Sequence, residues 1–343
     1  MARSRSTLAA VTLVLVVGLG LAGVPAFGRD AKLAIRPQKM AVEVGKYALL
    51  PSAASLTERD AVPLYEKAVK ALPTKALDDR IQKWLKMPTE QLPLDEAEKA
   101  LTQYVESFKC VAQAIKCREC KWPEAAAPNL QQYRNLSRAI RLWARYEIAQ
   151  ENYEGAVLAL RTGLGMGKHL TQGPTLMEYL VGVAVAATMC PEVGEFVQAG
   201  EAPNLYTALA ALPKPFADVE RVIEADKKAT PSEPPAGVTR AQFENDLAQG
   251  PKAYDRIRLI AKRLEADLAA LQCVEAIRSY AASHGGQLPQ TLAEITEVSV
   301  PKDPMGDAAF RYTRTGATAV LESALPAGGD AKDVTRYEIT VKN

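Results

Sequence analysis

The sequence predicts a mainly α-helical fold in which a domain of helical hairpins is followed by a small α+β domain. From Thr57 onward, apolar residues recur at steps of three and four over most of the chain. The composition is 48% apolar but only 6% aromatic, which is typical of a soluble helical protein. After Gly285-Gly286 the apolar pattern changes to the period of two that strands show.

The first 28 residues have the layout of an export signal. Arg3 and Arg5 precede an apolar run from Leu8 to Val24, and Ala26-Phe27-Gly28 offers small residues at the two positions that a signal peptidase reads. We therefore expect an exported protein, periplasmic or extracellular. The apolar run is about 17 residues long, near the lower limit for a membrane span. The alternative is a protein anchored to the inner membrane by residues 8–24.

Charge and composition set the expected partners and domains. Removal of the signal takes away two arginines, so the formal net charge changes from +2 to 2 − 2 = 0. A neutral chain gives no electrostatic reason to expect a nucleic acid partner. Thr230 to Gly237 holds three prolines without apolar periodicity and is the best linker. We expect a helical domain over 29–229, a linker with a bridging helix from Val238 to Ala248 within 230–252, and an α+β domain over 253–343.

In the helical domain the apolar stripes predict long helices. They run from Val62 to Leu72, from Ala97 to Ile115, from Leu130 to Ile148 and from Val157 to Leu164, and Leu176 to Met189 reads as a buried helix. The turn Glu151 to Ala156 between two of these stripes resembles that of a tetratricopeptide hairpin, which typically reads Gly-Asp-Tyr-Glu-Glu-Ala. A repeat array needs at least about three copies, and the period does not recur here. An ordinary antiparallel helix pair is the alternative.

In the last part of the chain, a helix of about 30 residues from Tyr254 to Ser283 is expected to end at Gly285-Gly286. Three runs with strand patterning follow, around Phe310 to Tyr312, Val320 to Glu322 and Tyr337 to Val341. The helix can bury its apolar face on one side of a three-stranded antiparallel sheet.

This C-terminal part resembles the globular domain of the major pseudopilin of type II secretion systems. The resemblance covers Ile277 to Tyr280, His284 to Pro289, Phe310 to Tyr312 and, most specifically, Pro301-Lys302-Asp303-Pro304-Met305-Gly306. A pseudopilin begins with its own apolar helix, and nothing of that kind precedes Tyr254, so we do not expect a filament subunit. The calcium loop of that family corresponds to Ser323 to Asp333, which keeps only Asp330 and Asp333 as oxygen ligands. Because calcium takes about six to eight oxygens, a solvated acidic turn is the alternative.

A second resemblance covers more of the chain. Cys120 to Trp122, Leu142 to Leu160, His169 to Gly182 and Leu209 to Phe216 are similar to a family of uncharacterised exported helical proteins abundant in planctomycete-type bacteria. Those proteins join a helical middle to a pseudopilin-like C-terminal segment. The resemblance implies an architecture and a compartment, and no activity.

The five cysteines and one histidine are the candidate metal or disulfide residues. Cys110 and Cys117 lie about 10 Å apart along a helix, too far to bridge, whereas Cys117 and Cys120 can form a disulfide where the helix frays. A zinc site is the functional alternative, although a single Cys-x-x-Cys is a weak signal. Its ligands would be Cys110, Cys117, Cys120 and His169. We expect no cofactor, with zinc at these residues or calcium at Asp330 and Asp333 as the alternatives.

Four arginines lie on one face of the predicted helix from Leu130 to Ile148, beside its apolar stripe. They are Arg134, Arg138, Arg141 and Arg145, at steps of four, three and four. Such a strip can bind an acidic partner, or it can be a solvated face with ion pairs to Glu147 or Glu151.

The motifs favour a binding role over an enzymatic one. Gly163 to Lys168 resembles a phosphate-binding loop, but Thr162 replaces its first glycine and the stretch lies within a helix, where close helix packing explains the glycines. No Gly-x-Ser-x-Gly elbow accompanies the two histidines. We therefore expect a non-catalytic, exported protein-interaction or scaffold component of the cell envelope, with a secretion-associated role suggested by the pseudopilin resemblance. The alternative is an envelope hydrolase that acts on polysaccharide with a carboxylate pair not identifiable from the sequence.

Overall fold

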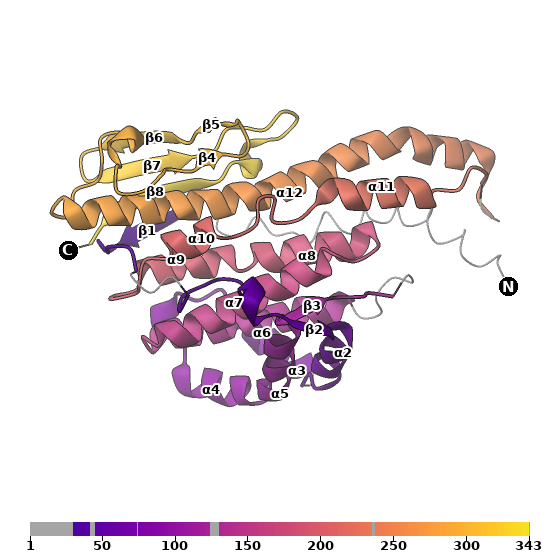
Figure 1. The fold of residues 1–343 in the computed structure, drawn as a ribbon, viewed down its shortest axis with the longest axis horizontal. Helices are drawn as coiled ribbons and strands as arrows, with labels where there is room; N and C mark the ends of the chain where they lie inside the picture. Colours follow the sequence, from indigo (N-terminus) through magenta and orange to yellow (C-terminus); the bar gives the residue numbers. More distant parts are fainter. Residues whose placement is uncertain (1–29, 42–44, 74, 124–129, 235–236, 343) are drawn as a thin grey trace.

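A computed structural model describes residues 30–41, 45–73, 75–123, 130–234 and 237–342 (Figure 1). The predicted export signal and anchor, residues 1–28, lie outside the described residues. The chain is mainly helical with a small sheet, as the composition and periodicity predict. Most helices form a body on one side of one very long helix. Most of the sheet lies on the other side of that helix near its C-terminal end, while its edge strand at Asp30–Ile35 reaches the side of the helical body (Figure 1).

The helical body comprises α2 to α11, of which α6, α7 and α8 pack against one another in succession. Its helices are α2 (Val62–Lys70), α3 (Lys75–Trp84), α4 (Leu94–Thr102), α5 (Val105–Ala114), α6 (Leu130–Ala149), α7 (Tyr153–Leu170), α8 (Leu176–Ala187), α9 (Cys190–Gln198), α10 (Tyr206–Ala210) and α11 (Val219–Ala229). Two short strands, β2 (Thr57–Asp60) and β3 (Cys117–Glu119), pair in parallel beside them. Short 3-10 turns, η3 (Ala53–Ser55) and η4 (Thr89–Gln91), complete the body.

Two details of the helical body bear on the predictions. The expected single helix from Ala97 to Ile115 is two helices, because a tight turn at Gln103-Tyr104 separates α4 from α5 and the Tyr104 hydroxyl donates to Asp78. The glycines of α7 allow the predicted close packing: a Cβ on Gly167 would lie 2.9 Å from the carbonyl oxygen of Gly182 on α8. The glycine run therefore belongs to a helix contact.

The stretch from Leu176 to Gln198 is long and apolar enough to cross a membrane, the one such stretch found among the described residues. It comprises α8 and α9, and 78% of its most apolar window is buried inside the protein. This burial agrees with the prediction of a core helix.

Helix α12 (Arg240–Ser283) is 44 residues long and spans the molecule (Figure 1). The expected bridging helix and the expected helix of the α+β domain are one continuous element that passes through Pro251. Thr239 and Gln242 form a capping box at its start. At its end Gly285 has φ 61° and the Gly286 amide donates to the carbonyl of Ala281, so the predicted glycine stop is confirmed.

The sheet has four strands in the order β1-β8-β7-β6. The three expected antiparallel strands are β6 (Arg311–Thr315), β7 (Thr318–Glu322) and β8 (Arg336–Val341). A turn with Gly316 at φ 62° joins β6 to β7. The expectation of only three strands is wrong, because β1 (Asp30–Ile35) pairs in parallel with β8. Two short strands, β4 (Lys302–Asp303) and β5 (Ala308–Ala309), form a separate pair, and η5 (Leu292–Glu294) and η6 (Ala331–Asp333) lie in the connections.

One apolar core connects the sheet, α12 and the helical body. The buried face of the sheet carries Leu33, Leu321 and Ile339, and these side chains belong to the same cluster as Leu271 of α12 and Phe196 of α9. The N-terminal strand thus contributes to a core built mostly from residues far along the chain.

We predict that the N-terminal strand stabilises the whole protein. Ile35 has no exposed surface, so Ile35→Ala should lower the free energy of unfolding by about 2–5 kcal/mol through lost contacts and a cavity. Urea denaturation measures the change. The control is Lys32→Ala on the same strand, where the side chain is 83% exposed and the change should stay within about 0.5 kcal/mol. Equal effects of the two substitutions would show that β1 does not pack on the core.

Candidate functional site

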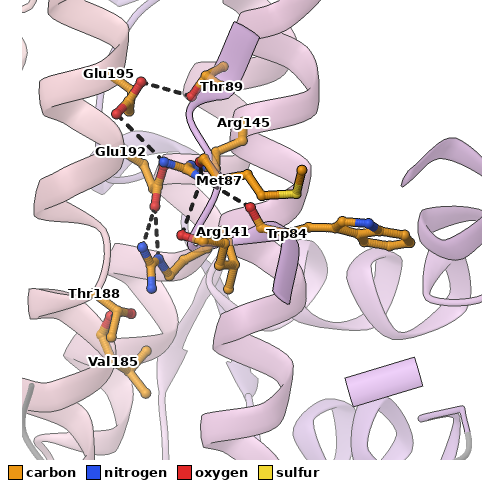
Figure 2. Close-up of polar contacts among 10 residues, drawn as sticks. Trp84, Met87, Thr89, Arg141, Arg145, Val185, Thr188, Glu192 and Glu195 are labelled. Atoms are coloured by element: carbon orange, nitrogen blue, oxygen red, sulfur yellow. Dashed lines mark hydrogen bonds and ion pairs between the residues drawn. The ribbon is translucent and has the colours of Figure 1, made fainter. Parts of the chain in front are cut away.

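A buried cluster of charges joins α6 to α9 (Figure 2). Glu192 of α9 has no exposed surface, and its Oε1 accepts hydrogen bonds from Nε and Nη2 of Arg141 at 2.9 and 2.6 Å. Its Oε2 accepts from Nε of Arg145 at 2.9 Å. One buried carboxylate therefore holds two guanidinium groups that lie one helical turn apart on α6.

The second guanidinium of this cluster reaches two further elements. Nη1 of Arg145 donates to the carbonyl oxygens of Trp84, Leu85 and Met87, at 3.4, 3.3 and 2.8 Å, and so closes the C-terminal end of α3. Its Nη2 lies 3.6 Å from Oε1 of Glu195, one turn beyond Glu192 on α9. The guanidinium group of Arg145 is therefore held by Glu192 and by the end of α3, and its charge helps to position Glu195.

Glu195 is the member of this cluster that reaches solvent. Its Oε2 accepts a hydrogen bond from the Thr89 hydroxyl at 2.8 Å (Figure 2). Its side chain is 30% exposed. Burial raises the pKa of Glu195, while the hydrogen bond from Thr89 and the charge of Arg145 oppose the rise. Thr89 and Arg145 therefore hold the carboxyl group in place, and they offset part of the rise in its pKa.

Glu195 lines a polar cleft between the helical body and the edge of the sheet, with a volume of about 620 Å³. Charged side chains of both signs line this polar cleft, and they are Lys32, Arg36, Glu90, Glu151, Glu195 and Lys342. Tyr153 lies among them, and its ring packs edge-on against Phe196 with 5.6 Å between centroids. Groups of this kind can bind a polar or charged ligand.

A second concave surface, the apolar groove, lies between α4, α5, α6 and α7 and has a volume of about 370 Å³. Its walls are formed mainly by Leu101, Val105, Phe108, Ala112, Trp143, Tyr146 and Leu158. The rings of Phe108 and Trp143 stack with 5.0 Å between centroids and 16° between planes. Val105 is 42% exposed and Leu158 38%, so two of the five exposed large apolar side chains in the described part of the chain lie in this one groove.

The predicted arginine strip is wrong as an exposed surface. Arg141 and Arg145 are 6% and 7% exposed and are bound to Glu192, because α9 packs on the face of α6 that carries them. Arg138 is half-buried and donates to Asn135 at 2.8 Å, and burial and the charge of Arg138 lower the pKa of Arg134. The same two arginines instead hold Glu195 at the polar cleft.

The predicted zinc ligands are not brought together. Among the described residues no group of three or more His, Cys, Asp and Glu side chains is placed to hold a metal ion. The five cysteines are free thiols, so the Cys117–Cys120 disulfide is not formed. Cys110 lies on α5 beside Glu106, and Nδ1 of His169 is instead hydrogen-bonded to the Tyr65 hydroxyl at 2.9 Å. These side chains belong to the packing of α2, α5 and α7.

The two predicted calcium ligands are used within the protein. Asp333 has no exposed surface and forms an ion pair with Arg263 of α12. Asp330 caps η6 by accepting from the Lys332 amide at 3.0 Å, and its carboxylate also pairs with the Lys332 ammonium at 2.7 Å. A guanidinium occupies the place of the expected cation, so the calcium alternative is not supported by this loop.

Sequence reasoning missed Glu192 and Glu195 as partners of the arginines. The sequence did contain a hint. Glu192 closely follows the apolar stretch that forms α8, so burial of its carboxylate could be inferred, and a buried carboxylate requires a cation. Arg141 and Arg145 lie about 50 residues from these glutamates in sequence, so the packing of α6 on α9 had to be known before they could be paired.

No protein-family model, curated protein or solved structure matches the chain. The function therefore has to be inferred from the geometry of these surfaces.

We predict that Glu192 is required for stability. Glu192→Gln removes the carboxylate that both buried guanidinium groups share and leaves Arg145 with Glu195 at 3.6 Å, which should cost about 3–5 kcal/mol of unfolding free energy. The matched control is Glu244→Gln, whose carboxylate pairs with Arg240 on the surface with 62% of the side chain exposed, and this should cost at most about 1 kcal/mol. Urea denaturation distinguishes the two; a loss for Glu192→Gln as small as the control would contradict the buried cluster.

We predict that His169 titrates far below the usual histidine range. Burial lowers its pKa from 6.5 to about 4, opposed by a backbone hydrogen bond to Cys117. Because the unfolded chain binds the proton more readily, the free energy of unfolding should fall as the pH is lowered from 6.5 through 4. The chain has two histidines, so a proton NMR titration, with His284→Gln for assignment, resolves each imidazole. A His169 midpoint near 6.5 would refute the buried geometry.

Proposed function

We propose that this chain is an exported, non-catalytic component of the cell envelope that binds an amphipathic helix of a partner protein in the apolar groove. The observation that carries the proposal is one concave surface of the helical body where two exposed apolar side chains, Val105 and Leu158, lie beside the half-buried rings of Trp143 and Tyr146. A contiguous apolar surface on a soluble protein can mark a site where another protein binds.

The form of the apolar groove fits a helix as its occupant. Val105, Phe108 and Ala112 recur at steps of three and four along α5, and Leu101 at the end of α4 lines the apolar groove with them. Val105 and Ala112 are seven residues apart on α5, a length of about 10 Å or two helical turns. A partner helix with apolar residues at matching steps can lay one face along these residues.

The rim of the apolar groove indicates the charge of the partner. Glu98 and Glu147 lie at the rim together with Lys109, so the acidic groups outnumber the basic one. The Glu147 carboxylate is held by the indole N–H of Trp143 at 2.9 Å. A partner helix with lysine or arginine beside its apolar stripe complements this rim.

Three finer expectations from the sequence stay proposals. The tetratricopeptide likeness of the α6–α7 hairpin and the role in the envelope both agree with a docking groove on a helical body. A secretion-associated role rests on the pseudopilin resemblance of the C-terminal part alone.

The hydrolase alternative has its best location at the polar cleft, because Glu195 has a raised pKa and Glu90 and Glu151 line the same cleft. We prefer the binding role, because the charge of Arg145, 3.6 Å from Glu195, opposes the protonation that a general acid requires.

The test is a photo-cross-linking amino acid placed at Lys109, on the rim of the apolar groove, in the cells that make the protein. We expect a cross-link to one envelope protein, at a site within an amphipathic helix of that protein. Leu158→Asp should lower the cross-link yield about tenfold or more, because a carboxylate on the lining of the apolar groove must be desolvated when the helix binds.

Leu247→Asp is the matched control, because Leu247 is an equally exposed leucine, at 44%, on α12 outside the apolar groove. Both substitutions are at exposed positions and should change stability by no more than about 0.5 kcal/mol. A yield that both substitutions reduce equally, or that neither reduces, would refute docking in the apolar groove.

A further inference from the structure

One wall of the polar cleft is basic, and the register of the sheet makes it so. Because β1 and β8 are parallel, Ile35 pairs with Val341, and the residues that follow them, Arg36 and Lys342, lie at the same end of the sheet. The backbone amide of Lys342 donates to the carbonyl of Ile35 at 2.8 Å, which fixes this end. Lys32 of β1 lines the same wall and pairs with Glu338 of β8 at 3.3 Å, so Arg36 and Lys342 are the two cations of this wall that the proposal uses.

The opposite wall is acidic. Glu195 projects from α9, Glu151 lies in the turn between α6 and α7, and Glu90 lies in η4. Ala149 and Gln198, the last residues of α6 and α9, also line the polar cleft. The C-terminal end of a helix carries a partial negative charge, so two helix ends add to the three carboxylates.

The two walls do not neutralise each other. Within the described residues, no nitrogen of Lys32, Arg36 or Lys342 lies within 4.0 Å of a carboxylate oxygen of the opposite wall. Opposite charges that face each other across a solvent-filled gap are a preformed site for a molecule that carries both charges at a matching separation. The acidic side is also rigid, because Thr89 and Arg145 hold Glu195.

We propose that the polar cleft binds a zwitterionic ligand of the peptide class, with its ammonium group against Glu195 and Glu151 and its carboxylate against Arg36 and Lys342. This site is separate from the apolar groove, and the inference does not depend on the partner helix. A carboxylate oxygen accepts more than one hydrogen bond, so Glu195 can bind an ammonium group while it keeps the hydrogen bond from Thr89.

The lining favours a primary ammonium over a quaternary one. Quaternary ammonium groups are bound by cages of several aromatic rings. Among the described residues that line the polar cleft, only Tyr153 is aromatic. A primary ammonium donates hydrogen bonds directly to carboxylates. The guanidinium of Arg36 can in turn bind a carboxylate through two parallel hydrogen bonds.

The experiment is isothermal titration calorimetry of the mature protein with tri-alanine, a peptide with both end charges and no charged side chain. The comparison ligands are N-acetyl-tri-alanine, tri-alanine amide and the doubly capped peptide. We expect tri-alanine to bind, and the removal of either end charge to weaken binding about tenfold or more. No detectable binding of tri-alanine, or equal binding of the doubly capped peptide, would overturn the proposal.

Variants locate the binding to the polar cleft. Glu195→Gln and Arg36→Gln should each weaken tri-alanine binding about tenfold or more, while the far-UV circular dichroism spectrum stays that of the parent. The matched controls are Glu244→Gln and Arg240→Gln, an exposed pair on α12 outside the polar cleft, and both should bind like the parent. Phosphoethanolamine tests the other common source of a primary ammonium beside an anion. If it binds and tri-alanine does not, the assignment to peptides is wrong.

Discussion

The arrangement of the molecule depends on one buried arginine. Arg278 of α12 has no exposed surface, yet its guanidinium donates to Glu275 at 2.7 Å, to the carbonyl of Ala202 at 3.0 Å and to the carbonyl of Arg36 at 3.0 Å. These acceptors belong to α12, to the loop after α9 and to the residue after β1. A buried guanidinium is tolerated only when its donors are satisfied, so the three segments must meet at this position.

Glu275 completes the junction from the other side. It is also fully buried, and it accepts from the backbone amide of Leu205 at 2.8 Å. Its backbone carbonyl accepts from the side chain of Asn204, which also donates to the carbonyl of Gln38. The N-terminal segment is therefore bound to α12 and to the helical body by hydrogen bonds, in addition to its strand pairing. This junction places the basic end of the sheet opposite Glu195, and the polar cleft exists because of it.

Local sequence patterns predicted the elements whose determinants are local. The glycine stop after Ser283, the buried helix at Leu176 and the turn at Gly316 follow from spacing, apolar content and glycine conformation, and all are present. The strand at Asp30 to Ile35 could not be predicted in this way, because its six residues alternate weakly in burial and its partner β8 lies about 300 residues away. A strand of that length is specified by its partner more than by itself.

The candidate sites show the same division. The spacing of the arginines showed that they share one face of a helix. Spacing alone cannot distinguish an exposed face from one that a second helix covers. Arg141 and Arg145 are covered, because Glu192 of α9 binds both. The polar cleft draws Arg36 and Glu195 from segments about 160 residues apart, and neither belongs to a motif. The apolar groove could be predicted in part, because its Phe108 and Trp143 lie on apolar stripes that are visible in the sequence.

Native-state hydrogen exchange at increasing urea concentration is the most direct test of the central claim, that β1, α12 and the helical body form one cooperative unit around Arg278. If they do, the most protected amides of β7 and β8 and those of α6 and α7 should open with the same free energy and the same dependence on urea. If the amides of the sheet instead open at a much lower free energy while α6 and α7 stay protected, the junction does not couple the two parts. The chain would then consist of two independent domains separated near residues 230–252.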